Sequence, residues 1–372
     1  MRICFYNLTA GFKSGGLETY CWEVGRALAR NGHEVTLIAG EGGQPRHAEV
    51  RLIALPYVPR QRFPDLGTRF RKLAERLSFA RHALPHLLAG GFDAVVVNKP
   101  YDFPALWYAR RRGFRGVVAL RSGGTEFYAC DRIFGRAVDL WLSTSAYNAE
   151  QVKRRYRREV AVVPNGVDPE MFAPQARDPG VRQRFGIPVD AFLIVSVGRL
   201  VGWKGLHTII EALAGIPGAH YLAAGDGAEK ARLLQLAARI GIGDRVHFAG
   251  EVTHGALPAL LNAGDVFVQP SIGEEAFGIS VVEAMACALP ALVSDQGGLR
   301  EIVRDGECGR LLPVDVIPAW RAALSELVAD PARARRMGTA ARRRAEDNFT
   351  WNANALRLAA LLQQAEERRC AA

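Results

Sequence analysis

The sequence predicts an α/β protein made of two Rossmann-like domains, each built on a parallel β-sheet with helices on both faces. Short apolar runs alternate with helical stretches along the chain, which is the pattern of repeated strand–helix–strand units. A polar, proline-containing stretch between residues 164 and 188 breaks the alternation, which then starts again. Since 372 residues are also long for one compact core, we expect two domains.

The first domain is predicted over residues 1–175. Its helix Leu17–Asn31 is followed by Gly32, the residue type that favours the backbone turn at a helix C-terminus. The predicted strands are short, mainly apolar runs, namely Arg2–Tyr6, Glu34–Ala39, Ala94–Val97, Gly116–Leu120, Leu140–Ser143 and Val160–Val163.

The second domain is predicted over residues 176–351 and repeats the same pattern. Helices are expected at Leu206–Leu213, Ala228–Arg239 and Ala319–Ala329, and a strongly helical segment that starts at Thr350 closes the chain. The predicted strands are Phe192–Val197, Tyr221–Ala224, Val246–Ala249, Val266–Gln269 and Ala291–Val293.

The net charge indicates which classes of partner the protein binds, and the cysteine content indicates the redox state of its compartment. The formal net charge of +10 and the isoelectric point near 9.6 favour phosphorylated ligands, anionic membranes or nucleic acids as partners. The six cysteines are scattered without a Cys-x-x-Cys pair, so we predict neither a zinc site nor a disulfide framework, and a reducing compartment fits best. No apolar run is long enough for a membrane span, and the first residues are expected to form a strand, not a signal peptide.

Two carboxylates, Glu275 and Glu283, lie on either side of a predicted loop-to-helix junction at Gly278. The loop follows the predicted buried strand Val266–Gln269, and ligands bind at the carboxyl ends of strands in open α/β sheets. A helix N-terminus carries unpaired N–H groups and partial positive charge, which suit a phosphorylated ligand. A pair of solvated glutamates is the ordinary alternative, but the position of the loop favours a binding site.

Arg199 and Lys204 follow another predicted buried strand and precede the helix Leu206–Leu213. An arginine and a lysine together suit a diphosphate whose negative charge grows as it leaves. An exposed ion-pair role is the alternative for such a pair taken alone. Only six of the 48 basic residues are lysines, and this rarity favours a chemical role for Lys204.

The stretch Gly11–Gly16 links the first predicted strand to a helix, and its glycines allow the backbone to approach a ligand. It does not match Gly-x-Gly-x-x-Gly, so dinucleotide binding is disfavoured. From these residues alone, a tight turn and a ligand-binding loop remain open.

Eight short motifs occur in order along the chain, and together they resemble glycosyltransferase family 4 of the GT-B fold over nearly its whole length. The motifs are Gly15-Gly16-Leu-Glu18, Pro164-Asn-Gly-Val-Asp168, Gly198-Arg-Leu with Lys204-Gly205, Gly225-Asp-Gly227, Val246-His-Phe-Ala-Gly250, Glu275-Ala-Phe-Gly278, Glu283-Ala-Met-Ala-Cys287 and Phe349-Thr-Trp351. The resemblance implies two Rossmann-like domains whose parallel sheets face a central cleft, with the last helix, about residues 352–372, returning to the N-terminal domain. It also implies a retaining hexosyltransferase that uses a nucleotide sugar as co-substrate, with no metal and no other cofactor.

The resemblance also implies roles for individual residues. Arg199 and Lys204 would grip the donor diphosphate and Glu275 would contact the transferred sugar, so these three are the predicted catalytic residues. Glu283 would bond the ribose hydroxyls. The other predicted donor-binding positions are Gly15 and Gly16 near the phosphates or the acceptor, Gly250 and Val252 at the base, and Phe277, Gly278 and Ile279, which would act through backbone N–H groups.

Four residues of the N-terminal half are predicted to face the acceptor. Lys13 belongs to the glycine-rich loop, and Asn98 and Lys99 end a predicted strand, where they faintly resemble the lipopolysaccharide-core members of the family. Arg121 opens a loop in which many relatives carry a histidine, so the acceptor is the least determined part of the prediction.

The predicted helix over residues 68–84 is basic and amphipathic. Phe70, Leu73, Leu77, Ala80 and Leu84 are expected on one face, with Arg69, Lys72 and Arg76 away from it. Such a helix lies on an anionic membrane or packs its apolar face on the sheet, and both interpretations stay open. Basic runs at Arg110–Arg115 and Lys153–Arg158 favour membrane contact.

We therefore predict a bacterial enzyme that moves a sugar from a UDP- or GDP-sugar to a glycan or lipid-linked acceptor in lipopolysaccharide or other cell-surface polysaccharide biosynthesis. We expect it in the cytoplasm, peripherally on the inner face of the cytoplasmic membrane. The alternatives are the same donor chemistry on a soluble small molecule, and a nucleotide-sugar epimerase or hydrolase. A basic nucleic-acid-binding protein is a distant alternative, because aromatic residues among the cations are few.

Overall fold

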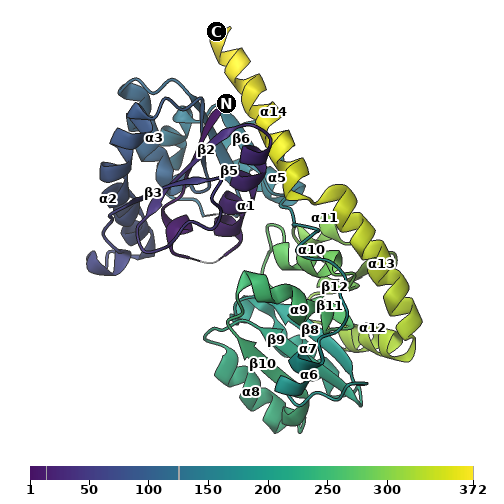
Figure 1. The fold of residues 1–372 in the computed structure, drawn as a ribbon. Helices are drawn as coiled ribbons and strands as arrows, with labels where there is room; N and C mark the ends of the chain where they lie inside the picture. Colours follow the sequence, from purple (N-terminus) through teal and green to yellow (C-terminus); the bar gives the residue numbers. More distant parts are fainter. Residues whose placement is uncertain (14, 125, 372) are drawn as a thin grey trace. The chain divides into compact units, whose positions relative to one another are not determined.

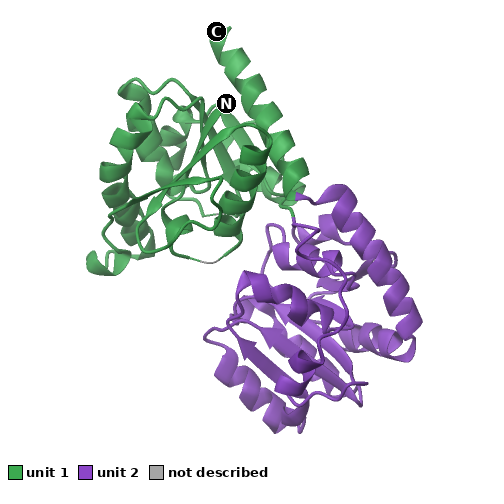
Figure 2. Ribbon diagram, in the orientation of Figure 1, with its two compact units in different colours: residues 1–166, 351–372 green, residues 167–350 purple. Residues whose placement is uncertain are grey.

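A computed structural model describes residues 1–13, 15–124 and 126–371, and the chain forms two compact units (Figures 1 and 2). Unit 1 comprises residues 1–166 and 351–372, and unit 2 comprises residues 167–350. We expected the first boundary near residue 175, but the chain changes unit after Gly166. The reason is that Val167 donates a backbone hydrogen bond to Phe349 at 2.8 Å and Phe172 packs in the unit 2 core.

Unit 1 contains a seven-stranded parallel sheet with the strand order β3-β2-β1-β4-β5-β6-β7. The predicted strands of this half are present, with ends shifted by at most two residues, and β3 was not predicted. The strands are β1 (Arg2–Tyr6), β2 (Glu34–Gly40), β3 (Arg51–Leu55), β4 (Ala94–Val97), β5 (Val117–Ser122), β6 (Leu140–Ser143) and β7 (Ala161–Val162).

Helices flank this sheet, with α2 and α3 on one side and α1 and α14 on the other (Figure 1). The last helix, α14, packs against α1, β5 and β6, so the end of the chain belongs to unit 1. The helices are α1 (Gly16–Arg30), α2 (Thr68–Ala89), α3 (Phe103–Arg111), α4 (Asp131–Phe134), α5 (Ala146–Tyr156) and α14 (Trp351–Cys370).

The buried face of α2 differs from the predicted one. Arg76, expected on the outer face, is buried and donates hydrogen bonds of 3.0 Å to both carboxylate oxygens of Asp102. Phe70 and Leu77, which lie on the predicted apolar face, are exposed. The spacing of apolar residues along α2 could not reveal that Arg76 pairs with Asp102, which lies 26 residues away in the sequence.

Unit 2 contains a six-stranded parallel sheet with the order β10-β9-β8-β11-β12-β13. All the predicted strands are present here too, and only the edge strand β13 was missed. The strands are β8 (Phe192–Val197), β9 (Ala219–Ala224), β10 (Val246–Gly250), β11 (Val266–Gln269), β12 (Ala291–Ser294) and β13 (Gly309–Leu312). The α/β class with two Rossmann-like halves is confirmed.

Two apolar clusters fill unit 2, and Leu193, Val195 and Ile194 of β8 contribute to them. Buried strands of this kind are apolar throughout, because helices cover both faces of the sheet. The helices of this unit are α6 (Pro179–Arg184), α7 (Leu206–Leu213), α8 (Lys230–Arg239), α9 (Leu257–Asn262), α10 (Ile279–Ala286), α11 (Leu299–Ile302), α12 (Ile317–Ala329) and α13 (Pro331–Asn348). Among the described residues of the whole chain, no helix is long and apolar enough to cross a membrane.

Candidate active site

The predicted donor residues of unit 2 gather at the carboxyl ends of β8 and β11. The loop after β8 forms a short 3-10 helix, Gly202–Lys204, and the loop after β11 runs to the start of α10. Ile272 and Gly273 donate backbone hydrogen bonds of 2.8 and 2.9 Å to the carbonyl of Trp203, which joins the two loops. Gly205 has φ of +66°, and a Cβ there would lie 2.1 Å from the Pro270 carbonyl, so only glycine permits this approach.

Glu275 lies at the centre of this group. Its Oε1 atom accepts hydrogen bonds from Lys204 Nζ at 2.5 Å, Gln269 Nε2 at 2.7 Å and Ser271 Oγ at 3.0 Å. Its backbone carbonyl accepts from the N–H of Gly298 at 2.8 Å. The loop and the carboxylate are therefore both held by the protein.

Lys204 and Arg199 supply positive charge beside that carboxylate. Lys204 is largely buried and its ammonium lies 4.8 Å from the centre of the Trp203 ring, a cation–π distance. Arg199 is exposed, and its guanidinium has no protein partner among the described residues. Gly198, Arg199, Lys204 and Gln269 line one small cavity. This edge of the sheet therefore offers a free cation and a paired one to a ligand.

Glu283 lies on α10, and its side chain is buried. Its Oε1 atom is 2.9 Å from Nε2 of His254, which belongs to a short 3-10 helix, His254–Ala256, and whose ring packs on Phe172. Burial and the neighbouring Glu283 raise the pKa of the Cys287 thiol to about 12, so this cysteine is a protonated packing residue.

The remaining predicted donor positions surround these groups. Gly278 precedes α10 with φ of +130°, and the first turn of that helix, which begins at Ile279, leaves backbone N–H groups without intrahelical partners. The Phe277 side chain is buried against Phe349, so only its backbone is available to a ligand. Gly250 ends β10 and its carbonyl accepts from Gly225 at 2.7 Å, while Val252 follows in the next loop, half-buried.

The glycine-rich loop of unit 1, predicted to lie near the donor phosphates or the acceptor, precedes α1. Gly15 lies immediately before the helix, which begins at Gly16, and a Cβ on Gly15 would lie 2.7 Å from Oε2 of Glu18. Lys13 is exposed, with its ammonium 5.9 Å from the centre of the Phe12 ring. Ser14, in the middle of this loop, lies outside the described residues.

Two of the predicted acceptor residues have buried side chains. Arg121 is 1% exposed, donates to Asn165 Oδ1 at 2.5 Å and lies 3.8 Å from the centre of the Tyr20 ring. Asn98 is 4% exposed and bonds Asn7 and the Arg121 carbonyl. Because both side chains are buried, neither can contact an acceptor directly in this structure. Arg121 and Asn98 instead link the ends of strands β1, β4 and β5.

Lys99 has a different environment from its neighbour Asn98. Its ammonium lies 3.1 Å from Glu126, whose other carboxylate oxygen lies 3.3 Å from Lys72. Burial lowers the pKa of Lys99, and the nearby Glu126 opposes that shift. Of the four predicted acceptor residues, Lys13 and Lys99 therefore keep a charged group near the surface.

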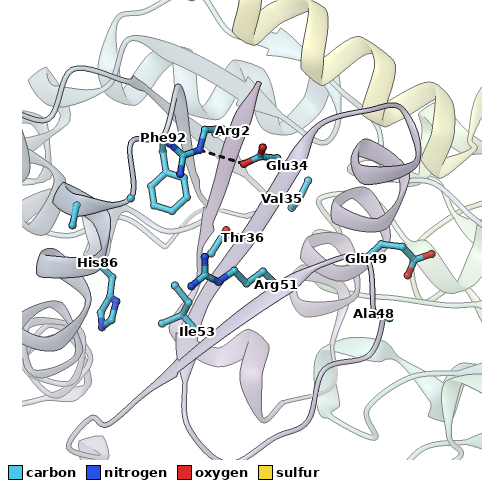
Figure 3. Close-up of a pocket in the computed structure, with 12 residues that line it drawn as sticks. Arg2, Glu34, Val35, Thr36, Ala48, Glu49, Arg51, Ile53, His86 and Phe92 are labelled. Atoms are coloured by element: carbon cyan, nitrogen blue, oxygen red, sulfur yellow. Dashed lines mark ion pairs between the residues drawn. The ribbon is translucent and has the colours of Figure 1, made fainter.

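A large cavity of about 690 Å³ lies elsewhere in unit 1 (Figure 3). Arg2, Glu34 and Arg51, which line it, begin the strands β1, β2 and β3, so the cavity lies at the amino ends of the strands. Arg2 and Glu34, which are neighbours in register on β1 and β2, form an ion pair at 3.3 Å. Ligands of parallel sheets bind at the opposite ends, and we assign no function to this cavity.

Three residues that contact the predicted site were missed in the sequence. Gln269 and Ser271 bond Glu275, and His254 bonds Glu283. Gln269 carried the one visible signal, because it is a polar residue at the end of an otherwise apolar buried strand. Within the described part of the chain, no group of three or more histidine, cysteine, aspartate or glutamate side chains could hold a metal ion.

Comparison with known protein families gives two matches that together span most of the chain. Residues 14–171 match the model described as Glycosyltransferase Family 4, and residues 179–344 match the model of Glycosyl transferases group 1.

Two curated relatives align over almost the full length. The D-inositol 3-phosphate glycosyltransferase of Xylanimonas cellulosilytica is 30% identical, over 96% of this chain and 93% of its own. The GDP-mannose-dependent alpha-(1-6)-phosphatidylinositol monomannoside mannosyltransferase of Mycolicibacterium smegmatis is 28% identical, over 96% of this chain and 97% of its own.

Solved structures share the fold. The sucrose-phosphate synthase of Thermosynechococcus elongatus has a TM-score of 0.82 and 26% identity, over 98% of this chain and 99% of its own. The Anabaena protein HepE, solved with UDP and glucose, has a TM-score of 0.80 at 21% identity, over 98% of this chain and 99% of its own, a likeness that bears on fold alone.

Proposed function

Since this chain belongs to glycosyltransferase family 4, we propose that it is a retaining enzyme that transfers a hexose from a UDP- or GDP-sugar to a glycan or lipid-linked acceptor of the cell surface. As a member of the family it is a glycosyltransferase that uses a nucleotide sugar. The retaining outcome, the residue roles and the acceptor class are the parts that we propose.

The observation that carries the proposal is the arrangement of charge around Glu275. Arg199 is an exposed cation to which the described part of the chain gives no partner, and Lys204 Nζ lies 2.5 Å from Glu275 Oε1. The first turn of α10 adds backbone N–H groups and the positive end of the helix dipole. A diphosphate is the ligand that these donors fit, and Glu275 beside them fits the hydroxyls of the attached sugar.

The proposed chemistry follows from where charge develops. Sugar transfer passes through an oxocarbenium-like state in which the bond from the anomeric carbon to the diphosphate oxygen breaks. Arg199 and Lys204 would stabilise the departing diphosphate more strongly than the bound substrate, which lowers the barrier. Glu283 would accept hydrogen bonds from the ribose hydroxyls through Oε2, since His254 occupies Oε1.

The acceptor proposal rests on relatives and on charge. The names of the two curated relatives specify inositol 3-phosphate and a phosphatidylinositol monomannoside, a phosphorylated small molecule and a lipid. The chain carries a net charge of +10, which favours an anionic acceptor or surface. We therefore place the acceptor among phosphorylated or lipid-linked glycans, including those of lipopolysaccharide.

We extend the proposal to peripheral contact with the cytoplasmic membrane through α2. Phe70 and Leu77 are exposed on that helix, and Arg69 and Arg81 are exposed beside them. Apolar side chains with basic neighbours favour an anionic lipid surface. Sedimentation with anionic liposomes at low salt should carry the wild type down and leave a Phe70→Ser/Leu77→Ser variant in solution. If the wild type does not sediment with these liposomes, the proposed membrane contact is excluded, and the proposed transferase activity is unaffected.

The donor part is tested by a thermal-shift panel of UDP- and GDP-sugars, followed by transfer assays with the sugar that stabilises the protein. The anomeric configuration of the product, measured by NMR, should match that of the donor. An inverted product would contradict the retaining assignment. Release of free sugar or of an epimer without an acceptor would favour the hydrolase or epimerase alternative.

A further inference from the structure

Gln269 is the last residue of β11 and is 3% exposed. The preceding residues of the strand, Val266, Phe267 and Val268, are apolar and fully buried. A buried primary amide is unfavourable unless its oxygen and its NH₂ group are hydrogen-bonded. The partners of this amide therefore explain why a polar residue occupies the position.

The Gln269 side chain bridges two parts of the predicted site. Its Oε1 atom accepts a hydrogen bond of 3.0 Å from Ser280 Oγ in the first turn of α10. Its Nε2 atom donates to Glu275 Oε1 at 2.7 Å. A flipped amide would place its oxygen against the carboxylate, so the Glu275 charge and the Ser280 hydroxyl select one orientation.

Three donors converge on the same oxygen of Glu275. Lys204, Gln269 and Ser271 all bond Oε1, at 2.5, 2.7 and 3.0 Å. For Oε2 the structure gives no protein partner within residues 1–13, 15–124 and 126–371. One carboxylate oxygen is thus fixed by the protein, and the other is available to a ligand.

The three hydrogen bonds to Glu275 would respond differently to a bound nucleotide sugar. In the proposed function Lys204 binds the diphosphate. Its hydrogen bond to Glu275 is then weaker, because the ammonium also bonds a phosphate oxygen. Gln269 is anchored in a core strand and held at its far end by Ser280, so its bond to Glu275 does not depend on the ligand. A group locked by neighbouring hydrogen bonds keeps its partner in the productive geometry.

Resting on the proposed function, we propose that Gln269 is a positioning residue. It fixes the Glu275 carboxylate with Oε2 free for the transferred sugar while Lys204 is engaged by the diphosphate. Ser280 acts through Gln269, by setting the direction of the amide. Gln269 acts on the sugar through Glu275, because its amide is already bonded to Glu275 and Ser280.

The test is the effect of Gln269→Met on the full-length enzyme, because methionine keeps the approximate shape and removes both hydrogen bonds. We measure nucleotide release from the donor sugar that the wild type uses. Loss of a hydrogen bond to a charged group predicts that kcat falls about 10- to 100-fold. The KM for the donor should stay within about twofold, because the diphosphate and ribose contacts remain.

The coupling to Ser280 separates positioning from packing. Ser280→Ala should lower kcat by a smaller factor than Gln269→Met, and the double variant should match Gln269→Met alone. A general packing defect would instead lower thermal stability and give additive losses, and either result would overturn the proposal. Ser280 is only half-buried, so its variant keeps the test decisive if Gln269→Met fails to fold.

The result for the wild type distinguishes this inference from the proposed function. A wild type that turns over no UDP- or GDP-sugar would overturn both. Wild-type turnover together with an unchanged kcat in Gln269→Met would overturn the positioning role alone. A raised donor KM with unchanged kcat would also overturn it, because Gln269 would then act in binding.

Discussion

The ammonium of Lys204 lies 2.5 Å from Oε1 of Glu275. Two of the three predicted catalytic residues therefore form an ion pair with one another. In the proposed function, a donor diphosphate would compete with Glu275 for Lys204, so that binding would exchange one ion pair for another. The largest benefit then comes late in the reaction, when negative charge accumulates on the leaving diphosphate.

Replacement of Lys204 should affect the chemical step. We expect Lys204→Met to lower kcat for transfer about 100-fold, because one preorganised donor to the leaving group is lost. Steady-state kinetics with saturating donor provide the measurement. Lys230→Met is the matched control, since this other lysine of unit 2 pairs with Asp226 at 3.6 Å and should leave kcat within about twofold. Equal losses in both variants would argue against a role for Lys204 in transfer.

Replacement of His254 should affect donor binding. His254 Nε2 lies 2.9 Å from Glu283 Oε1, and His254→Ala removes the group that orients this carboxylate. We expect the donor KM to rise about fivefold with a small change in kcat. A rise of this size corresponds to the loss of about one hydrogen bond. His254→Gln places an amide N–H donor at this position and should recover part of the affinity. A donor KM that does not change in His254→Ala would contradict the assignment of Glu283 to the ribose.

Breaking the buried ion pair of Arg76 and Asp102 should destabilise unit 1. Both side chains are nearly inaccessible, and Arg76→Met would leave a buried carboxylate without its cation. We expect a loss of about 3–5 kcal/mol in the free energy of unfolding, measured by urea denaturation. Arg69→Met, at an exposed position on the same helix, should change it by less than about 0.5 kcal/mol. The double variant Arg76→Met/Asp102→Leu should regain much of the loss.

A histidine pair in unit 2 should make stability depend on pH. The rings of His220 and His247 stack at 5.4 Å, and burial lowers the pKa of both imidazoles below 6.5. The unfolded chain then binds protons at higher pH than the folded one, so this stabilisation is complete above about pH 6.5 and is lost as the pH falls through the folded pKa values. The melting temperature should fall less on acidification in His220→Gln/His247→Gln than in the wild type. His82→Gln, at an exposed site, should follow the wild type, and identical profiles for all three would refute this prediction.

The spacing of apolar residues and the positions of turn residues predicted most strands of the two sheets. The two strands that were not predicted, β3 and β13, differ from the others in physical ways. Strand β3, Arg51–Leu55, lies at a sheet edge and is only partly buried, so it lacks a continuous apolar run. Strand β13 is likewise an edge strand, four residues long, that contains Arg310. Strands at an edge meet fewer neighbours, and their sequences carry a weaker signal.

Side-chain partners were the part that the sequence could not supply. The positions of Glu275, Lys204 and Arg199 at strand ends follow from the order of elements, and the structure brings them to one edge of the unit 2 sheet. The contacts of Gln269 with Ser280 and of His254 with Glu283 depend on how loops fold back, 11 and 29 residues along the chain. The burial of Arg121 and Asn98 likewise depends on neighbours from separate strands.

Titration of UDP-glucose and GDP-mannose into the wild type and into Arg199→Ala/Lys204→Ala, followed by calorimetry, tests the central claim most directly. The proposed donor site predicts saturable binding of at least one nucleotide sugar by the wild type, and binding weakened about 100-fold or more in the variant, since two charge-assisted contacts to the diphosphate are removed. Equal affinity in the two proteins would contradict the assignment of the diphosphate to this edge of the unit 2 sheet.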